Sequence, residues 1–340
     1  MNPSFCFTHR ERFGLIPGSR KGMNRANHPV CRGSISAILT VFALIQLLGA
    51  EQRESTTSLQ EARRGFATQL VRKQKADEPV PDPPPRFFRV VKYDSPAGKL
   101  AAYVSVSPQD GKKHPSVIWL FGGFSNSIGE TAWEQGPPEN DQSAGAFREA
   151  GIIMMYPSLR GGNKNPGFIE GFYGEVDDVL GASEYLAKLD YVDPKRIYLG
   201  GHSTGGTLAL LVAESTDRFR AVFAFGPVED ASSYGSKYLP FDNSNGKEVD
   251  LRAPIKWLQT IRNPTFVFEG TEKRSNIDSV MALSRASRNP LVHFHAVKGA
   301  DHFSILAPVS RLVASKILRD DGVDSNIKFT ENELTGALHK

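Results

Sequence analysis

A serine flanked by two nearby glycines is the residue of this chain whose setting most clearly suggests chemistry. Ser203 is the centre of a Gly-x-Ser-x-Gly pentapeptide that runs from Gly201 to Gly205. The pentapeptide follows an apolar run at residues 197–199 and precedes a helix-prone stretch at residues 207–214. Glycine has no Cβ that would collide where a strand turns sharply into a helix, so the pattern predicts a strained turn. Such a turn would expose the serine hydroxyl as a nucleophile.

A serine hydroxyl is a poor nucleophile at neutral pH, so it needs a base and hydrogen-bond donors already in place. His302 follows the last apolar run of the chain and is the predicted base that takes the proton from Ser203. The first predicted oxyanion donor is the backbone N–H of Thr204, which follows the nucleophile. The second is the backbone N–H of Gly123 or Phe124, in a loop with little side-chain bulk.

The elements that must position these groups begin at residue 86, where apolar runs start to alternate with helical stretches. Two strand-like segments at residues 87–93 and 100–107 predict an antiparallel entry hairpin. Continuous apolar runs, typical of strands covered on both faces, follow at residues 117–121, 152–156, 197–199, 221–225, 265–268 and 292–297. The order predicts an α/β fold with a doubly wound, mostly parallel eight-stranded sheet and an antiparallel edge. The nucleophile and the base should then meet beyond the carboxyl ends of the strands.

Four stretches of this predicted domain resemble the catalytic domain of the prolyl-oligopeptidase-like serine hydrolases, which have the α/β-hydrolase fold. They are residues 160–162 together with 171–174, residues 191–197, the serine pentapeptide with the trailing Gly206, and residues 299–302. The resemblance covers residues 86–320. It implies an acyl-enzyme mechanism and a triad whose serine, acid and histidine follow one another in that chain order.

The acid of the triad is the member that the sequence leaves open. The family pattern after the relevant strand is Gly-x-x-Asp, whereas this chain has Gly270 followed by Thr, Glu272 and Lys273. Glu272 is the first choice, because the extra methylene of glutamate could make up part of the one-residue offset. Glu269 is the alternative acid. Asp278, or no acid at all, is the remaining possibility.

Histidines elsewhere in the domain are expected to be structural. His293 and His295 alternate along one predicted strand, a spacing that could suggest a metal pair. No further histidine or carboxylate cluster joins them, so we predict no metal site and no cofactor. His202, beside the nucleophile, is expected to pack under the loop or to line the pocket.

The first 50 residues are predicted to target the protein rather than to fold with it. Residues 34–50 carry no charge, follow several basic residues and end in a small-residue pair, which is typical of a secretory signal. An uncleaved anchor is the alternative, because a 17-residue helix would reach about 25 Å against roughly 30 Å of hydrocarbon. A buried core helix is the third possibility. We therefore expect export to the periplasm or the cell exterior, or membrane attachment with the catalytic domain outside the cytoplasm.

Charge and cysteine usage support this division of the chain. Residues 1–50 hold six of the Lys and Arg residues, one acid and both cysteines. Removing their charge of +5 from the net charge of +4 leaves about −1 on the rest of the chain. A domain that is not basic argues against a nucleic-acid partner. Residues 51–85 are polar and end in a proline-rich run, which predicts a disordered linker. Residues 321–340 are expected to form a C-terminal tail.

The function predicted from the sequence follows from what surrounds the hydrolase. The prolyl oligopeptidases that this chain resembles select substrates with an N-terminal propeller, and residues 51–85 leave no room for one. We therefore predict an exported serine hydrolase that cleaves carboxylic esters of small or medium acyl groups. A short-peptide or aminoacyl-amide hydrolase of the prolyl oligopeptidase type is the alternative. A non-catalytic envelope binding protein on the same scaffold is the rival from another class.

Overall fold

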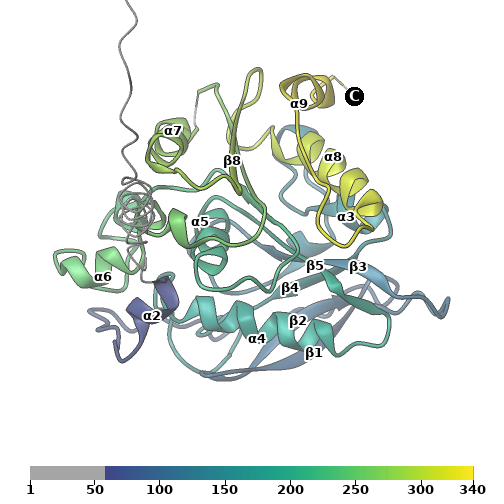
Figure 1. Cartoon of the computed structure of the whole chain (residues 1–340). Coiled ribbons are helices and arrows are strands. Elements are labelled where there is room, and N and C mark those ends of the chain that lie inside the picture. Colours follow the sequence, from purple (N-terminus) through teal and green to yellow (C-terminus); the bar gives the residue numbers. More distant parts are fainter. Residues whose placement is uncertain (1–57, 274, 340) are drawn as a thin grey trace, which may run out of the picture. The chain divides into compact units, whose positions relative to one another are not determined.

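One eight-stranded sheet organises the computed structural model, which describes residues 58–273 and 275–339 (Figure 1). The predicted signal or anchor at residues 34–50 lies outside the described residues. No helix in those two ranges is long and apolar enough to cross a membrane. The strands are β1 (Phe88–Ser95), β2 (Gly98–Ser105), β3 (His114–Leu120), β4 (Ile153–Pro157), β5 (Val192–His202), β6 (Val222–Phe225), β7 (Thr265–Gly270) and β8 (Val292–Val297).

The strand order is β1-β2-β4-β3-β5-β6-β7-β8. The β1 and β2 strands form the antiparallel hairpin, and β2 also pairs antiparallel with β4. All later neighbours, from β4 and β3 through to β7 and β8, pair in parallel. The predicted doubly wound α/β fold with an antiparallel edge is therefore confirmed.

The two faces of the sheet carry separate apolar clusters because side chains alternate along each strand. In β3, Ile118 and Leu120 belong to one cluster, whereas Val117 and Trp119 belong to the other. The first cluster contains buried residues of α4 (Glu175–Ala187), α5 (Thr204–Ala213) and α7 (Ile277–Ala286). The second contains residues of α3 (Gly145–Glu149) and α8 (Leu306–Arg319). Burial on both faces explains why the parallel strands read as continuous apolar runs.

The segment before the hairpin differs from the expected linker. Residues 58–85 lie along the domain, beginning with the short helix α2 (Leu59–Arg63), whose Leu59 side chain is fully buried. Further along, Leu70 forms a β-bridge with Phe241. The Tyr103 hydroxyl donates a hydrogen bond to the Pro81 carbonyl. Backbone groups of this segment form hydrogen bonds with the domain, whereas those of a free linker would form them with water.

The segment after α8 is also part of the domain rather than a tail. Helix α9 (Glu331–Ala337) starts with a capping box at Thr330 and buries Leu334. Phe329 packs edge-on against Phe266 and Phe268 of β7, with ring centroids 5.0 Å apart in each pair. The short helix α6 (Gly246–Asp250) and the 3-10 turns Ala231–Tyr234, Pro254–Lys256 and Leu258–Thr260 fill the connection between β6 and β7.

Candidate active site

Ser203 stands at the junction of β5 and α5 with φ 56° and ψ −116°, a left-handed backbone that non-glycine residues rarely adopt. Its N–H donates to the Phe225 carbonyl at 2.7 Å, which holds the turn against the neighbouring strand β6. A Cβ on Gly201 would meet the Gly205 carbonyl oxygen, and one on Gly205 would meet the Leu120 carbonyl oxygen. The strand-to-helix turn predicted from the glycine spacing is thus present, and it requires those glycines.

His302 lies in the loop after β8, and its partner is Glu269 near the end of β7. The Nδ1 atom of His302 is 3.1 Å from Oε1 and 3.3 Å from Oε2 of Glu269. Glu269 is completely buried and His302 is 7% exposed. The same Oε1 accepts the Asn276 N–H at 2.9 Å, which fixes the carboxylate. A neutral imidazole held at Nδ1 in this way presents Nε2 as a base.

This pairing corrects the expectation that Glu272 orients the histidine. Glu272 is exposed, and its Oε1 accepts the backbone N–H of Gly299 at 3.3 Å. Asp278, the other possibility, is exposed in the first turn of α7. The reason lies in the length of β7, which continues to Gly270. Glu269 is therefore still within the strand and beneath the histidine loop, whereas Glu272 has already followed the chain out to solvent.

Gly226 ties the nucleophile strand to the histidine and its acid. It follows Phe225, the residue that accepts the Ser203 N–H, and has φ +57°. A Cβ on Gly226 would overlap Cε1 of His302 and lie 2.5 Å from Oε2 of Glu269. The absence of a side chain at this position lets the imidazole and the carboxylate settle directly over the end of β6, beside the serine turn.

His202 is a second buried histidine in contact with the first. Its ring centroid lies 4.5 Å from that of His302, and its Nε2 is 3.0 Å from the His302 carbonyl oxygen. Burial, with a smaller effect of the nearby His302, lowers the pKa of His202 to about 3. The neutral ring therefore donates its Nε2 proton to that carbonyl and supports the histidine loop. The sequence suggested packing at this position, but it did not show which group His202 would hold.

The loop predicted to supply oxyanion donors lies against the nucleophile turn. The Thr204 hydroxyl donates to the Gly123 carbonyl at 2.5 Å, which joins the start of α5 to the loop after β3. Gly123 has φ +94°, a conformation that favours glycine. Phe124 stacks on Tyr238, with ring centroids 4.5 Å apart. The structure thus brings Thr204, Gly123 and Phe124 together beside the nucleophile turn, and their role as oxyanion donors stays a prediction.

Tyr234 enters the site from the connection after β6. Its hydroxyl lies 2.8 Å from Oγ1 of Thr207 and also interacts with the side chain of Ser203. Burial raises the pKa of Tyr234, so the phenol is neutral and carries a proton that it can donate. The sequence marked residues 230–256 as an aromatic segment in the place of a cap. Which of its aromatic residues would reach the nucleophile depended on the fold of that segment.

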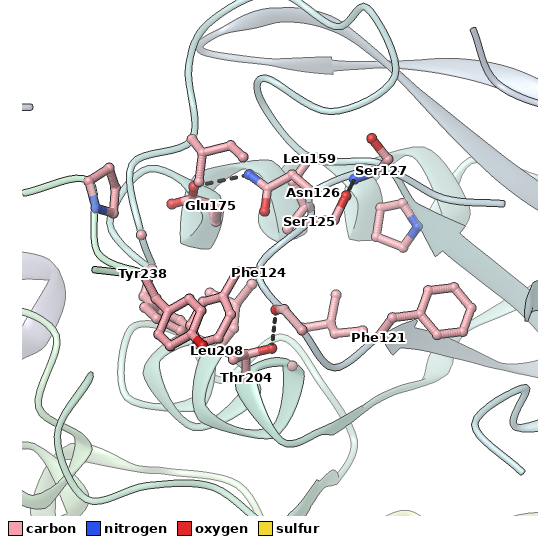
Figure 2. Close-up of a pocket in the computed structure, with 18 of the residues that line it drawn as sticks. Phe121, Phe124, Ser125, Asn126, Ser127, Leu159, Glu175, Thr204, Leu208 and Tyr238 are labelled. Atoms are coloured by element: carbon pink, nitrogen blue, oxygen red, sulfur yellow. Dashed lines mark hydrogen bonds between the residues drawn. The ribbon is translucent and has the colours of Figure 1, made fainter. Parts of the chain in front are cut away.

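A pocket opens beside the nucleophile turn (Figure 2). Thr204 and Gly123 lie at one side of it, and Figure 2 shows Glu175 and Asn126 joined by a hydrogen bond on another. The apolar residues that line it include Leu120, Phe124, Leu159, Phe172, Leu208 and Tyr238. An apolar cavity with a few polar groups, next to an activated nucleophile, is the form expected of a substrate pocket.

The N-terminal segment supports the walls of this pocket from outside. The backbone N–H groups of Val71 and Arg72 both donate to the Pro240 carbonyl, at 2.8 and 3.2 Å. The Arg72 guanidinium donates to the Leu239 carbonyl at 2.5 Å. On another wall, the Ile169 N–H donates to the Gln74 carbonyl at 2.9 Å. Residues 71–74 therefore fasten two separate loops that line the cavity.

No group of three or more potential metal ligands occurs in the described ranges 58–273 and 275–339. His293 and His295 stack on aromatic rings of β7: the centroid of the first lies 5.1 Å from that of Phe266, and that of the second 5.2 Å from Phe268. Burial lowers the pKa of His295 to about 4. Both side chains thus behave as flat packing groups on the outer strand.

Comparison with known proteins points to one family. The profile described as "Prolyl oligopeptidase family" matches residues 139–310. The acylamino-acid-releasing enzyme of Rattus norvegicus is 27% identical over 259 residues, which are 66% of this chain and 32% of that protein. Dipeptidyl peptidase 8 of Homo sapiens is 30% identical over 169 residues, 44% of this chain and 17% of that protein.

Solved structures show the same fold at low sequence identity. A Mycobacterium tuberculosis puromycin-hydrolyzing peptidase superposes with a TM-score of 0.55 at 20% identity, over 68% of this chain and 39% of that one. The acylaminoacyl peptidase of Pyrococcus horikoshii gives 0.55 at 16% identity, over 74% of this chain and 44% of that one. The chain thus spans less than half the length of these relatives.

Proposed function

The chain belongs to the prolyl oligopeptidase family of serine hydrolases, and from that premise we propose that it cleaves short peptides or aminoacyl amides through an acyl-enzyme. The observation that carries the proposal is the buried Glu269–His302 pair beside the strained Ser203 turn. The relatives named above are peptidases, which favours the amide-hydrolase alternative over the ester hydrolase that the sequence first suggested. Esters remain plausible model substrates, because they form the same acyl-enzyme more easily.

The proposed reaction has two steps, acylation of Ser203 and hydrolysis of the acyl-enzyme, and each group of the site acts in both. His302 Nε2 takes the proton of Ser203 Oγ as the oxygen attacks the acyl carbon, while Glu269 accepts the hydrogen bond from Nδ1. The backbone N–H of Thr204 and that of Gly123 or Phe124 stabilise the oxyanion. The histidine then returns its proton to the leaving amine. Water repeats the sequence on the acyl-enzyme and releases the acid.

The rival proposal of a non-catalytic binding protein rested on the irregular loop after β7. The position of Glu269 removes that reason, because the histidine has a buried carboxylate in place of the missing aspartate. Residues 71–74 also brace the walls of the pocket beside the nucleophile turn. We infer that this pocket contributes to the selection of substrates.

The test uses the purified full-length chain with two kinds of reagent. A fluorophosphonate probe reports on the nucleophile, and paired 4-nitrophenyl esters and 4-nitroanilides of the same amino acids report on the bond cleaved. We expect labelling of the wild type that is lost in Ser203→Ala, together with turnover of both substrate types. If the probe labels the protein and esters are cleaved but amides are not, the protein is an ester hydrolase, as the sequence first suggested. Labelling that persists in Ser203→Ala would remove the nucleophile assignment.

Export remains part of the proposal, based on the uncharged stretch at residues 34–50 after a basic region. Mass spectrometry of the protein recovered from cells distinguishes the two forms expected, a chain cut near residue 50 and a full-length chain retained in the membrane fraction. Recovery of the full-length chain in the cytosol would contradict both.

A further inference from the structure

Glu175 brings a buried carboxylate to the substrate pocket without satisfying it completely. The residue begins α4, lines the pocket and is 2% exposed. Its Oε1 accepts the Asn126 side-chain amide at 3.1 Å and the Glu170 N–H at 2.7 Å. Its Oε2 has no hydrogen-bond partner in the part of the chain that the structure describes. Leaving a buried carboxylate oxygen without a donor is costly, so this atom calls for an explanation.

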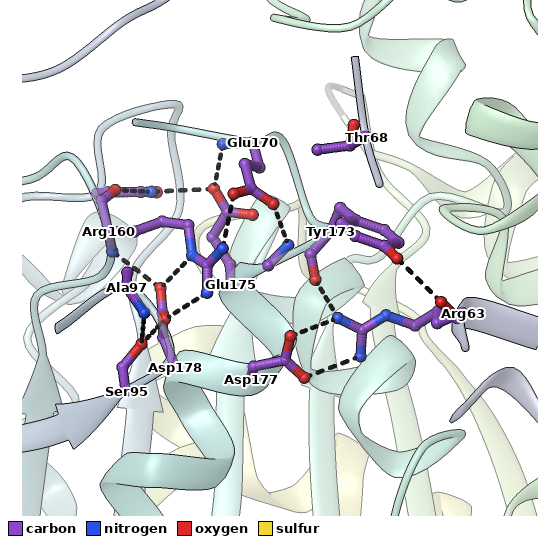
Figure 3. A network of polar contacts seen from close by, with 12 residues as sticks. Arg63, Thr68, Ser95, Ala97, Arg160, Glu170, Tyr173, Glu175, Asp177 and Asp178 are labelled. Atoms are coloured by element: carbon purple, nitrogen blue, oxygen red, sulfur yellow. Dashed lines mark hydrogen bonds and ion pairs between the residues drawn. The ribbon is translucent and has the colours of Figure 1, made fainter. Parts of the chain in front are cut away.

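The cation whose charge acts on Glu175 is Arg160, and Figure 3 shows it paired with other acids. Arg160 donates from Nε and Nη2 to Asp178 and from Nη1 to Glu170, at 2.7 to 3.0 Å. The Arg160 guanidinium is therefore taken up by Asp178 and Glu170, and Glu175 is not among its acceptors. Burial raises the pKa of Glu175, and the charge of Arg160 opposes that rise. A cation that reached Oε2 would balance the group and complete its hydrogen bonding.

Other arginines near this cluster do not supply the missing charge. Arg63 pairs with Asp177 at 2.9 Å, as Figure 3 shows, and its guanidinium also donates to the Tyr173 carbonyl. Arg252 pairs with Glu248 at 2.5 Å and is fully buried among backbone carbonyls. Each of these cations is matched by its own carboxylate. The excess negative charge therefore stays at the pocket end of α4.

The walls between the nucleophile and Glu175 determine what kind of cation could reach it. Phe124, Leu208, Phe172 and Tyr238 make this passage apolar and aromatic. Lysine and arginine side chains match such a passage, because a flexible aliphatic stem packs on apolar groups while the charged head continues beyond them. A small hydrated ion would gain nothing from these walls.

We propose that Glu175 is a specificity residue whose Oε2 binds the ammonium or guanidinium group of a lysyl or arginyl residue on the acyl side of the scissile bond. The acyl side follows from the pocket's position beside Thr204 and Gly123, where the proposed oxyanion donors hold the reacting carbonyl. The inference rests on the proposed amide hydrolysis and adds the class of substrate to it.

The first experiment needs only the wild-type full-length chain. Lysyl, arginyl, norleucyl and glutamyl 4-nitroanilides are compared, each with a free and with an acetylated N-terminus. Norleucine has the stem of lysine without the charge. We expect kcat/KM for the lysyl substrate to exceed that for the norleucyl one by about 10- to 100-fold, the usual effect of one charge-assisted hydrogen bond, with the glutamyl substrate poorest. Equal or better cleavage of the norleucyl substrate would overturn the proposal.

A binding readout separates failure of this inference from failure of the proposed function. Pentylammonium and the uncharged pentanol are tested for their ability to slow fluorophosphonate labelling of Ser203. Stronger protection by the ammonium compound supports the cation site, whether or not any amide is cleaved. If the protection is seen but no amide is cleaved, the proposed amide hydrolysis is wrong and the cation site stands. Equal protection by the two compounds, or none, counts against the cation site whatever bonds the enzyme cleaves.

A matched pair of variants then assigns the preference to one residue. Glu175→Gln should lower the lysyl-to-norleucyl ratio of kcat/KM by the same 10- to 100-fold. Glu184→Gln is the control, because Glu184 lies on the same helix but is exposed and pairs with Arg218 on the surface. An unchanged ratio in a folded Glu175→Gln protein would remove Glu175 as the source of the preference. Should that variant not fold, the wild-type comparison and the protection assay still decide the proposal.

Discussion

Glu269 Oε1 lies 3.1 Å from Nδ1 of His302, and the two side chains meet over a glycine at the end of the neighbouring strand. This relationship supplies the acid of the proposed serine, acid and histidine set, whose members come from three different strand ends. It also places the acid inside β7 rather than in the loop after it.

Replacing the acid should separate the two glutamates that the sequence proposed. Glu269→Gln is expected to lower kcat by roughly 10⁴-fold, because the imidazole loses the carboxylate that holds its productive tautomer. Glu272→Gln is the control, and its rate should stay close to that of the wild type, since Glu272 is exposed. Steady-state kinetics on one ester substrate measures both. Comparable losses in the two variants would contradict the assignment of Glu269.

Adding one methyl group at Gly226 should disable the site. In Gly226→Ala the new Cβ overlaps Cε1 of His302 and crowds Oε2 of Glu269, and the residue also has a positive φ. We expect kcat to fall by at least roughly 100-fold, since small displacements of catalytic groups have effects of that size. A Gly235→Ala variant is the control, because that glycine has a positive φ but nothing within 4 Å of its Cβ position. Equal kinetic effects in both would show that backbone strain, not the overlap, is responsible.

His202 should make stability depend on pH. Its pKa in the folded protein is about 3, against an ordinary value of 6.5. Between these two pH values the unfolded chain binds a proton at His202 and the folded chain does not. The contribution of this residue is fully present above pH 6.5 and is lost as the pH falls toward 3, with a slope of about 1.4 kcal/mol per pH unit. Urea unfolding between pH 7 and 5 measures that slope in the wild type and in His202→Phe. The same slope in both proteins would assign the dependence to other groups.

Glu214 should make the protein less stable as the pH rises, the opposite of what most carboxylates do. Burial raises its pKa well above 4.5, and neither of its side-chain oxygens has a partner within the described residues. The folded state therefore prefers the protonated acid, and stability falls as the pH rises above 4.5. Glu214→Gln should therefore have a higher Tm than the wild type at pH 8, and this difference should be smaller at pH 4. The expected size is about 2–4 °C for each kcal/mol of stability gained. A Tm difference between the variant and the wild type that is the same at both pH values would rule out ionisation as its cause.

The N-terminal segment should act on substrate binding more than on chemistry. Arg72→Ala removes the guanidinium that donates to the Leu239 and Ser236 carbonyls at the pocket wall. We expect KM to rise by roughly 5- to 30-fold, the equivalent of one or two hydrogen bonds, with a smaller change in kcat. Lys75→Ala is the control, because that side chain is exposed. A selective loss of kcat in Arg72→Ala would place the segment closer to the reacting atoms than the structure does.

Much of the site was readable from local patterns. Ser203 and His302 could be proposed from the sequence because a glycine-flanked serine and a histidine after the last strand are local signals, which can be interpreted without knowledge of distant contacts. The mostly parallel sheet was predicted from apolar runs covered on both faces, whereas the order of its strands came from the structure. The acid was harder to predict from the sequence, since the choice between Glu269 and Glu272 required knowing where β7 ends. The end of that strand is set by its pairing with β6 and β8. The linker prediction for residues 58–85 was wrong because polar and proline-rich composition says nothing about partners supplied by the domain surface.

The sequence by itself determined the fold class and singled out Ser203 and His302 as the candidate nucleophile and base, because those features depend on residue type and spacing along the chain. The tertiary structure decided which carboxylate faces His302, that residues 71–74 brace the pocket, and that Glu175 reaches it with one oxygen unpaired. The physical reason is the same in each case. Burial and hydrogen bonding are properties of residues brought together from distant parts of the chain, and composition alone does not record which residues those are.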